Sequence, residues 1–295
     1  MNNKSIYYIT ICLAALCFFC LVENAAAQSS VAKNELSVYV QGGSSFLNYS
    51  SEMGGEREMG FGIGGGIQYA VYLDSSWSVS IGAGLQQYHS KNGFSDLDVS
   101  YATTDTEGDP FEYMITMETL NEDQWVYMLN IPVRIQYETL GEKTRFFGAA
   151  GFQWGVPLSS RFQSRATNLE TSGYYPEWDA VLESPLFAGF GNWNELSGEK
   201  EDLELKHSYG LQFELGIKQM FGENQRIYAG VYADLGLNDL KKTGIEKTRL
   251  VGYNNDDPGQ PNLGTVIYAA HENRNFVKKV SMRGFGIRLR YAFTW

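Results

Sequence analysis

The sequence predicts an all-β fold, namely an eight-stranded antiparallel transmembrane β-barrel with short periplasmic turns and long extracellular loops. Three observations predict it. Apolar residues alternate with polar or small residues through eight segments, short and long connections alternate between those segments, and the last segment keeps its alternation to the final residue. Alternate side chains of a strand lie on opposite faces, so each segment is apolar on one face only.

The N-terminus has the pattern of a secretory signal peptide. Lys4 precedes an apolar run over residues 6–22, and small residues at 25–27 form a cleavage site. We therefore predict a signal peptide over residues 1–27 and a barrel domain over residues 28–295. All three cysteines, Cys12, Cys17 and Cys20, lie in the signal peptide. The mature chain thus has no thiol for a disulfide, a metal site or a nucleophile.

The mature chain is acidic. The formal net charge is −11, and it does not change on cleavage because Lys4 and Glu23 leave together. This excess of negative charge argues against nucleic acid as a partner.

The eight segments follow one another with the same alternation. We predict strands at 35–43, 59–73, 76–89, 124–137, 144–156, 207–221, 225–237 and in the closing stretch 279–295. The short connections are 74–75, 138–143 and 222–224, and the long ones are 44–58, 90–123, 157–206 and 238–278. Strict alternation of short and long connections is typical of outer-membrane barrels, with both termini in the periplasm.

The closing segment shows the two faces most clearly. Its apolar row is Phe285, Ile287, Leu289, Tyr291, Phe293 and Trp295, and the intervening positions are Gly284, Gly286, Arg288, Arg290, Ala292 and Thr294. In a soluble sandwich the apolar row would face the core, whereas in an outer-membrane barrel it faces lipid. The eight repeats favour the barrel, so we expect outer-membrane lipid as a partner and the outer membrane of a Gram-negative bacterium as the location.

Two short segments carry a family resemblance. The run Leu129-Asn130-Ile131-Pro132-Val133 and the terminal run 290–295, together with the signal peptide, resemble the PorT-type outer-membrane β-barrel proteins of Bacteroidota. The resemblance implies a barrel whose C-terminal aromatic residues, Tyr291, Phe293 and Trp295, form the signal that the barrel-assembly machinery recognises. It implies no substrate.

Basic side chains are predicted to gather inside the barrel. The inward cluster comprises Arg134, Arg145, Lys218, Arg226, Arg288 and Arg290, and the inward acids counted are Glu214 and Asp234. A narrow interior stabilises charges only when they are paired, which favours a salt-bridged plug. The alternative is a basic vestibule that attracts anions. Inward glycines, among them Gly66 and Gly84, leave room for tyrosines such as Tyr39 in an interior just wide enough to be filled.

No catalytic, cofactor or metal site is predicted. The run Gly60–Gly65 is close to a dinucleotide-binding spelling, but it lies within a strand and lacks the helix that the motif needs. Each of His89 and His207 is followed by a serine, which must point to the opposite face of its strand, so the arrangement of lipid-modifying barrels is missing. Asp105–Asp109 is the best candidate for Ca²⁺ in an acidic loop, although a solvated loop is favoured.

The sequence therefore predicts a non-enzymatic barrel that anchors extracellular loops for surface interaction or envelope assembly. Aromatic residues of the third long loop mark an extracellular protein or glycan as a candidate ligand; they are Tyr174, Tyr175, Trp178, Phe187, Phe190 and Trp193. The alternatives are a small channel for anionic or polar solutes and, less favoured, a lipid- or peptide-modifying enzyme.

Overall fold

The computed structural model describes residues 34–51, 55–245, 248–271 and 274–295. The predicted signal peptide, residues 1–27, lies outside them. The described chain is almost wholly strand, apart from one short 3-10 helix, η1 (Leu186–Ala188). None of its helices is long and apolar enough to cross a membrane.

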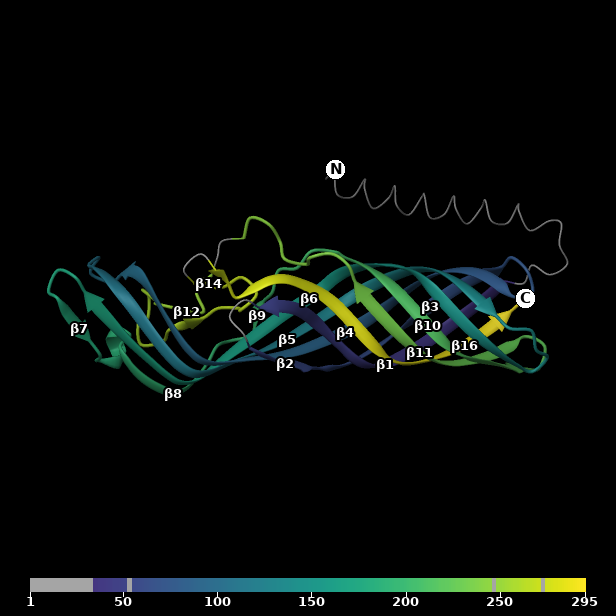
Figure 1. Ribbon diagram of the computed structural model, residues 1–295, viewed down its shortest axis with the longest axis horizontal. Helices are drawn as coiled ribbons and strands as arrows, with labels where there is room; N and C mark the ends of the chain where they lie inside the picture. The colour runs from purple at the N-terminus through teal and green to yellow at the C-terminus, as the bar shows by residue number, and fades with distance from the viewer. Residues whose placement is uncertain (1–33, 52–54, 246–247, 272–273) are drawn as a thin grey trace.

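Eight antiparallel strands form a closed ring, whose tilted strands are visible in Figure 1. In ring order they are β1 (Asn34–Ser51), β3 (Phe61–Tyr72), β4 (Trp77–Thr104), β5 (Pro110–Glu138), β6 (Thr144–Tyr175), β10 (Ser208–Phe221), β11 (Gln225–Gly236) and β16 (Val277–Thr294). Pairing of β6 with β10 and of β1 with β16 completes the circle. Closure gives every strand two neighbours, so no edge of the ring is left unpaired.

Both chain ends and the short connections lie at one end of the ring. Asn34 and Trp295 exchange backbone hydrogen bonds of 3.0 and 3.1 Å there. The connections at this end are 73–76, 139–143 and 222–224, close to the predicted short turns. We call this the turn end and the opposite end the loop end.

The long connections are not the loops that the sequence predicts. Residues 90–123, expected as a loop, continue β4 and β5 as a hairpin closed by residues 105–109. In the region 157–206, β6 runs on to Tyr175, and its edge pairs with β7 (Ala180–Leu182), β8 (Gly191–Ser197) and β9 (Glu201–Asp202). In the region 44–58, β1 continues to Ser51 and β2 (Glu56–Met59) pairs with β4. The prediction of long loops was therefore wrong in these places.

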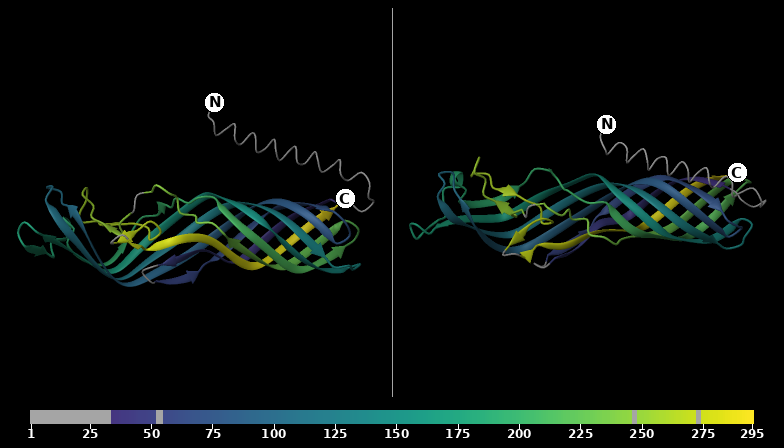
Figure 2. Two further views of the ribbon diagram at one scale, coloured as in Figure 1. Left: turned by 45° about the horizontal axis from the view of Figure 1, so that its top comes forward. Right: turned by 90° about the horizontal axis from the view of Figure 1, so that it is seen from above.

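The last long connection folds back over the continued strands. It contains the short strands β12 (Val251–Gly252), β13 (Asn262–Leu263), β14 (Ala270–His271) and β15 (Arg274–Asn275). Several of its apolar side chains, including Val266 and Ile267, are fully buried. Together with residues 90–123 and 157–206, this connection (237–276) forms a body that projects beyond the ring, which we call the extension (Figure 2).

The ring and the extension have opposite polarity. Around the ring, apolar side chains face outward and are exposed, such as Val40 and Ile287, each at 62 %. We call this outward apolar band the belt; on β5 it runs from Trp125 to Tyr137. In the extension, apolar side chains such as Ile115 and Leu120 point inward into one buried core.

The alternation of inward and outward residues changes phase at one level on three strands. Each of β4, β5 and β6 has two consecutive outward residues there, and Asp96, Glu118 and Asn168 interrupt the ladders between the three strands. Asp96 and Asn168 have φ of 52° and 46°, in the left-handed region that short polar residues tolerate. Paired residues share a face, and here the three neighbouring strands change phase at the same level, so their faces stay matched. Hydrogen bonds across this level join Asn168 to Glu118 and, at 2.6 Å, Thr119 to Thr167.

Candidate functional site

The interior of the ring contains one carboxylate surrounded by arginines. Glu214 on β10 accepts hydrogen bonds from Arg134 at 2.5 Å and from Arg288 at 2.8 Å, and Arg290 lies 4.0 Å away. All four side chains are buried. They come from three different strands of the ring, so the ion pairs tie β5, β10 and β16 together across the interior.

Amide side chains bind the guanidinium groups further. Arg288 donates to Gln41, Arg134 to Gln68, and Arg290 to Gln136. The ring of Tyr228 lies 3.9 Å from the guanidinium carbon of Arg290. Each cation therefore has polar or aromatic partners, as a buried charge requires.

A second layer lies closer to the turn end and is centred on Lys218. Its ammonium group donates to both carboxylate oxygens of Glu138 at 2.9 Å and to the Tyr72 hydroxyl at 2.6 Å. Glu35 lies 3.6 Å away and accepts from Tyr72 and Tyr228 at 3.0 and 2.7 Å. This layer joins β1, β3, β5, β10 and β11.

Two of these acids were missed by the sequence prediction, which counted only Glu214 and Asp234 as inward acids. Glu35 and Glu138 are also inward and buried. Glu35 is the first residue of the predicted strand 35–43 and Glu138 follows the predicted strand 124–137 directly, and both have the parity of the inward residues of their strands, so following the alternation to the strand ends would have found both. Asp234 accepts from the Gln212 amide at 2.9 Å.

The predicted basic cluster is thus divided among three places. Arg134, Arg288 and Arg290 surround Glu214, and Lys218 belongs to the second layer. Arg145 binds Glu138 at 3.3 Å and the carbonyl oxygens of Ser75 and Gly141 in two turns at the turn end. Arg226 binds the carbonyl oxygens of Glu223 and Gln225 in the third turn.

Glycine residues give aromatic side chains the room that fills the interior. The Tyr39 hydroxyl lies where a Cβ on Gly84 would be, and it would also crowd a Cβ on Gly66. The run Gly60–Gly65 enters strand β3 and is followed by more strand, not by a helix. The interior is therefore packed with side chains and carries no nucleotide-binding turn in this run.

The acidic hairpin of the extension uses Asp105 as a structural group. Its carboxylate accepts from the backbone N–H groups of Glu107 and Asp109, both at 2.9 Å, and from the Tyr175 hydroxyl at 3.0 Å. Burial raises the pKa of this carboxyl, but these hydrogen bonds outweigh burial and hold the pKa below its ordinary value. Within the described ranges, no group of three or more His, Cys, Asp or Glu side chains is placed to hold a metal ion.

A second carboxylate holds the last long connection in place. Glu122 accepts from Val266 N at 2.8 Å, Thr265 Oγ1 at 3.0 Å and Ser164 Oγ at 3.1 Å. The outward neighbours of Glu122 on β5, Asn121 and Asp123, are polar, so this residue lies beyond the belt. Burial raises the pKa of the Glu122 carboxyl, although its hydrogen-bond donors oppose the shift.

Four of the six aromatic residues predicted to mark recognition fall into two groups, and the other two, Tyr174 and Trp193, are half-buried. Tyr175 and Phe190 are buried in a cluster with Phe111, and the ring centroid of Phe111 lies 5.1 Å from Tyr175 and 5.6 Å from Phe190. Trp178 and Phe187 are instead 54 % and 79 % exposed at the far end of the extension.

The exposed group packs against a buried aromatic residue. Trp178 stacks on Tyr175 with centroids 4.9 Å apart. Val181 and Leu186, which are also exposed, lie between Trp178 and Phe187 in the sequence. We call Trp178, Val181, Leu186 and Phe187 the tip.

Two of the three histidines, His89 and His207, lie on the outer surface, and His271 belongs to β14 of the extension. His89 binds Asp123 at 3.2 Å and stacks on Trp125, and Trp154 donates to His207 at 3.3 Å. Ser90, in contrast, points inward and accepts from Leu47 N. The serine and histidine of this pair are thus on opposite faces, as the alternation predicted.

A comparison with protein families agrees with this architecture. The sequence model of a family described as "Outer membrane protein beta-barrel domain" matches residues 26–242. A search of curated proteins gave no match. Similar solved structures include Ail, the attachment invasion locus protein of Yersinia pestis, in complex with the heparin analogue sucrose octasulfate, at 10 % identity and a TM-score of 0.32 over 90 % of this chain and 99 % of that chain. Neisserial surface protein A also has 10 % identity and a TM-score of 0.32, over 89 % of this chain and 96 % of that chain.

The family match extends over most of the chain, and the closed ring with its outward apolar belt has the polarity that a lipid environment demands. This protein belongs to the outer membrane protein beta-barrel domain family and resides in the outer membrane of a Gram-negative bacterium.

Proposed function

We propose that this protein is a non-enzymatic barrel with a filled interior, which anchors the extension at the cell surface for contact with an extracellular protein or glycan. The observation that carries the proposal is the tip: exposed Trp178 and Phe187 on a body with its own hydrophobic core. Aromatic side chains are enriched at recognition surfaces because they bury a large area and lose little conformational entropy.

The interior supports anchoring over transport. The three arginines around Glu214 and the layer around Lys218 cross the ring from strand to strand. A pore would need space and free charges in place of these buried, ion-paired groups.

The turn end supports a role in assembly for the C-terminus. Tyr291, Phe293 and Trp295 face outward on β16 and are 37 %, 47 % and 60 % exposed. We propose that the barrel-assembly machinery recognises this aromatic row, as in PorT-type proteins, and that residues 1–27 direct export. In this arrangement the turn end is periplasmic and the extension is extracellular.

The function is tested by surface attachment. Cells that display the wild type, and cells that display a variant with both Trp178→Ser and Phe187→Ser, are compared for adhesion to surfaces coated with extracellular-matrix proteins or with glycans. We expect the variant to lose most adhesion while its heat modifiability stays that of the wild type. The control is Leu140→Ser, an equally exposed apolar residue at the turn end.

Three results would contradict the proposal. They are wild-type cells that bind no better than cells without the protein, equal adhesion of the tip variant, or stable conductance of the purified protein in planar bilayers. Conductance abolished by Arg134→Ala and Arg288→Ala would support the anion channel instead.

A further inference from the structure

One strand of the extension has a free edge. Residues 97–104 of β4 pair with β5 on one side, from Leu97 with Met117 to Thr104 with Pro110. On the other side β2 reaches only as far as Gly93, and no strand among the described residues pairs with 97–104. Such an edge presents N–H and C=O groups that can pair with another strand.

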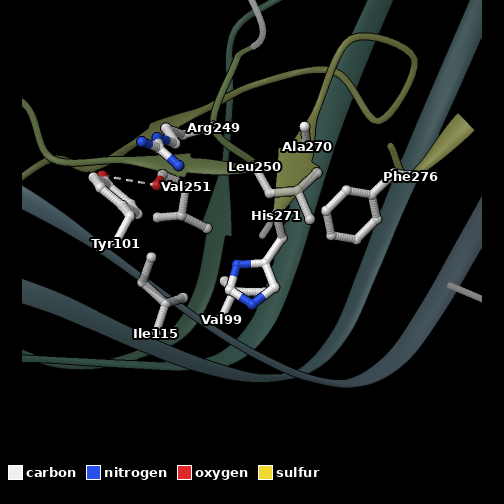
Figure 3. A pocket seen from close by; sticks show the side chains of 9 residues that line it. All are labelled: Val99, Tyr101, Ile115, Arg249, Leu250, Val251, Ala270, His271 and Phe276. Carbon is white, nitrogen blue, oxygen red and sulfur yellow. Dashed lines mark hydrogen bonds between the residues drawn. The ribbon is translucent and has the colours of Figure 1, made fainter. Parts of the chain in front are cut away.

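The free edge adjoins a depression between the sheet and the last long connection. Val99 and Ile115 line it from the sheet, and Val251 and Phe276 line it from the connection (Figure 3). The depression is shallow and partly open to solvent. A strand added to the edge would place every second side chain on this apolar side.

The opposite face of the same edge is acidic. Asp96 and Asp98 on β4 are exposed there, and Glu112 of β5, which pairs with Ala102 further along the edge, is on the same face and accepts from Ser100 at 2.6 Å. Side chains of adjacent strands lie about 4.5–5.5 Å apart when directly opposite. The other set of alternate side chains on an added strand would therefore meet carboxylates, which favours lysine or arginine.

We propose that the free edge of β4 binds an extended polypeptide segment of a partner protein in which basic and apolar residues alternate. This inference rests on the proposed function, because it assigns a class of partner to the extension. Backbone hydrogen bonds would supply affinity, the depression would select an apolar side chain, and the carboxylates would select the basic ones.

The inference is tested with synthetic peptides and the whole protein in nanodiscs. The probe is a fluorescent peptide as long as the free edge, alternating lysine with valine or phenylalanine, and binding is measured by anisotropy. The matched control is the same peptide N-methylated at the amides of one edge, which keeps its charge and side chains but removes its donors. We expect the control to bind about tenfold more weakly or worse, since each lost hydrogen bond contributes about 0.5–1.5 kcal/mol.

Variants distinguish binding at the free edge from non-specific electrostatic attraction to an acidic surface. Asp98→Lys, an exposed and outward position, is expected to weaken the lysine peptide and to strengthen a peptide with glutamate in place of lysine. The double tip variant Trp178→Ser and Phe187→Ser should bind the lysine peptide as the wild type does. Hydrogen exchange should show new protection of the amides in 97–104.

Several outcomes would overturn the inference. Equal binding of the N-methylated peptide, or no effect of Asp98→Lys, would mean that charge alone attracts the probe. A dimer of the purified protein that protects 97–104 without peptide would assign the edge to a second copy. If the peptide fails to bind while tip-dependent adhesion persists, this inference falls and the proposed function stands.

Discussion

The ring and the extension share three strands, β4, β5 and β6, yet they bury opposite kinds of side chain. In the ring, ion pairs and amides fill the interior and apolar residues lie outside; in the extension, an apolar core lies inside and carboxylates lie outside. The comparison teaches that strand alternation specifies two faces, whereas the surrounding solvent decides which face is buried.

The largest effect is expected inside the ring. Glu214→Ala leaves Arg134, Arg288 and Arg290 without their shared carboxylate, and breaking a buried ion pair costs about 3–5 kcal/mol. The free energy of unfolding, measured by urea titration in lipid vesicles, should fall by that amount. Asp202→Ala, which removes the exposed partner of Arg161 at 3.5 Å, should leave it almost unchanged. Equal effects would mean that the interior charges are solvated.

The next effect tests the outward faces. Leu289→Arg places a charge on the belt, where it costs about 2–4 kcal/mol near the bilayer midplane. Insertion, measured by heat modifiability, should be markedly impaired. Thr116→Arg is the matched control, since Thr116 is also outward and exposed on β5, but in the extension. If both variants insert equally well, the belt does not face lipid.

A smaller effect compares the same chemical change in the two regions. Ile115→Val removes one methylene from the core of the extension and should cost about 0.5–1.5 kcal/mol. Ile287→Val removes one from the belt, where lipid chains can fill the space, and should cost less. Hydrogen exchange of amides in the extension and in the ring measures the two stability losses separately. A larger loss of stability for Ile287→Val than for Ile115→Val would contradict the comparison.

The smallest effect concerns pH and should be confined to the extension. Because the pKa of Asp105 is lowered in the folded state, its ionised carboxylate stabilises the hairpin above the unfolded pKa. This contribution is lost as the pH falls through the lowered value, below about pH 4. Amide exchange of residues 105–109, corrected for intrinsic rates, should accelerate below that pH. Asp105→Asn should abolish this pH-dependent acceleration. A step that persists in Asp105→Asn would assign it to another carboxylate.

The sequence by itself determined the positions of the eight ring strands and which residues share a face. Alternation of period two is a local property, so the outward row from Phe285 to Trp295 and the inward Arg288 and Arg290 could be predicted. The interior pairing could be predicted only in part. Which acid meets which base depends on the register of strands far apart in the chain, as for Lys218 with Glu35 and Glu138.

Only the tertiary structure decided the extension. On β5, Ile115 and Met117 have the same odd parity as Tyr127 and Leu129, yet the first two are buried in a protein core and the last two face outward. The reversal lies in the two consecutive outward residues Glu118 and Thr119, which are shared across three paired strands. The alternation within one strand does not depend on which strands pair with it or on whether lipid or water surrounds it. The sequence pattern therefore predicts the alternation but not the side on which the core forms.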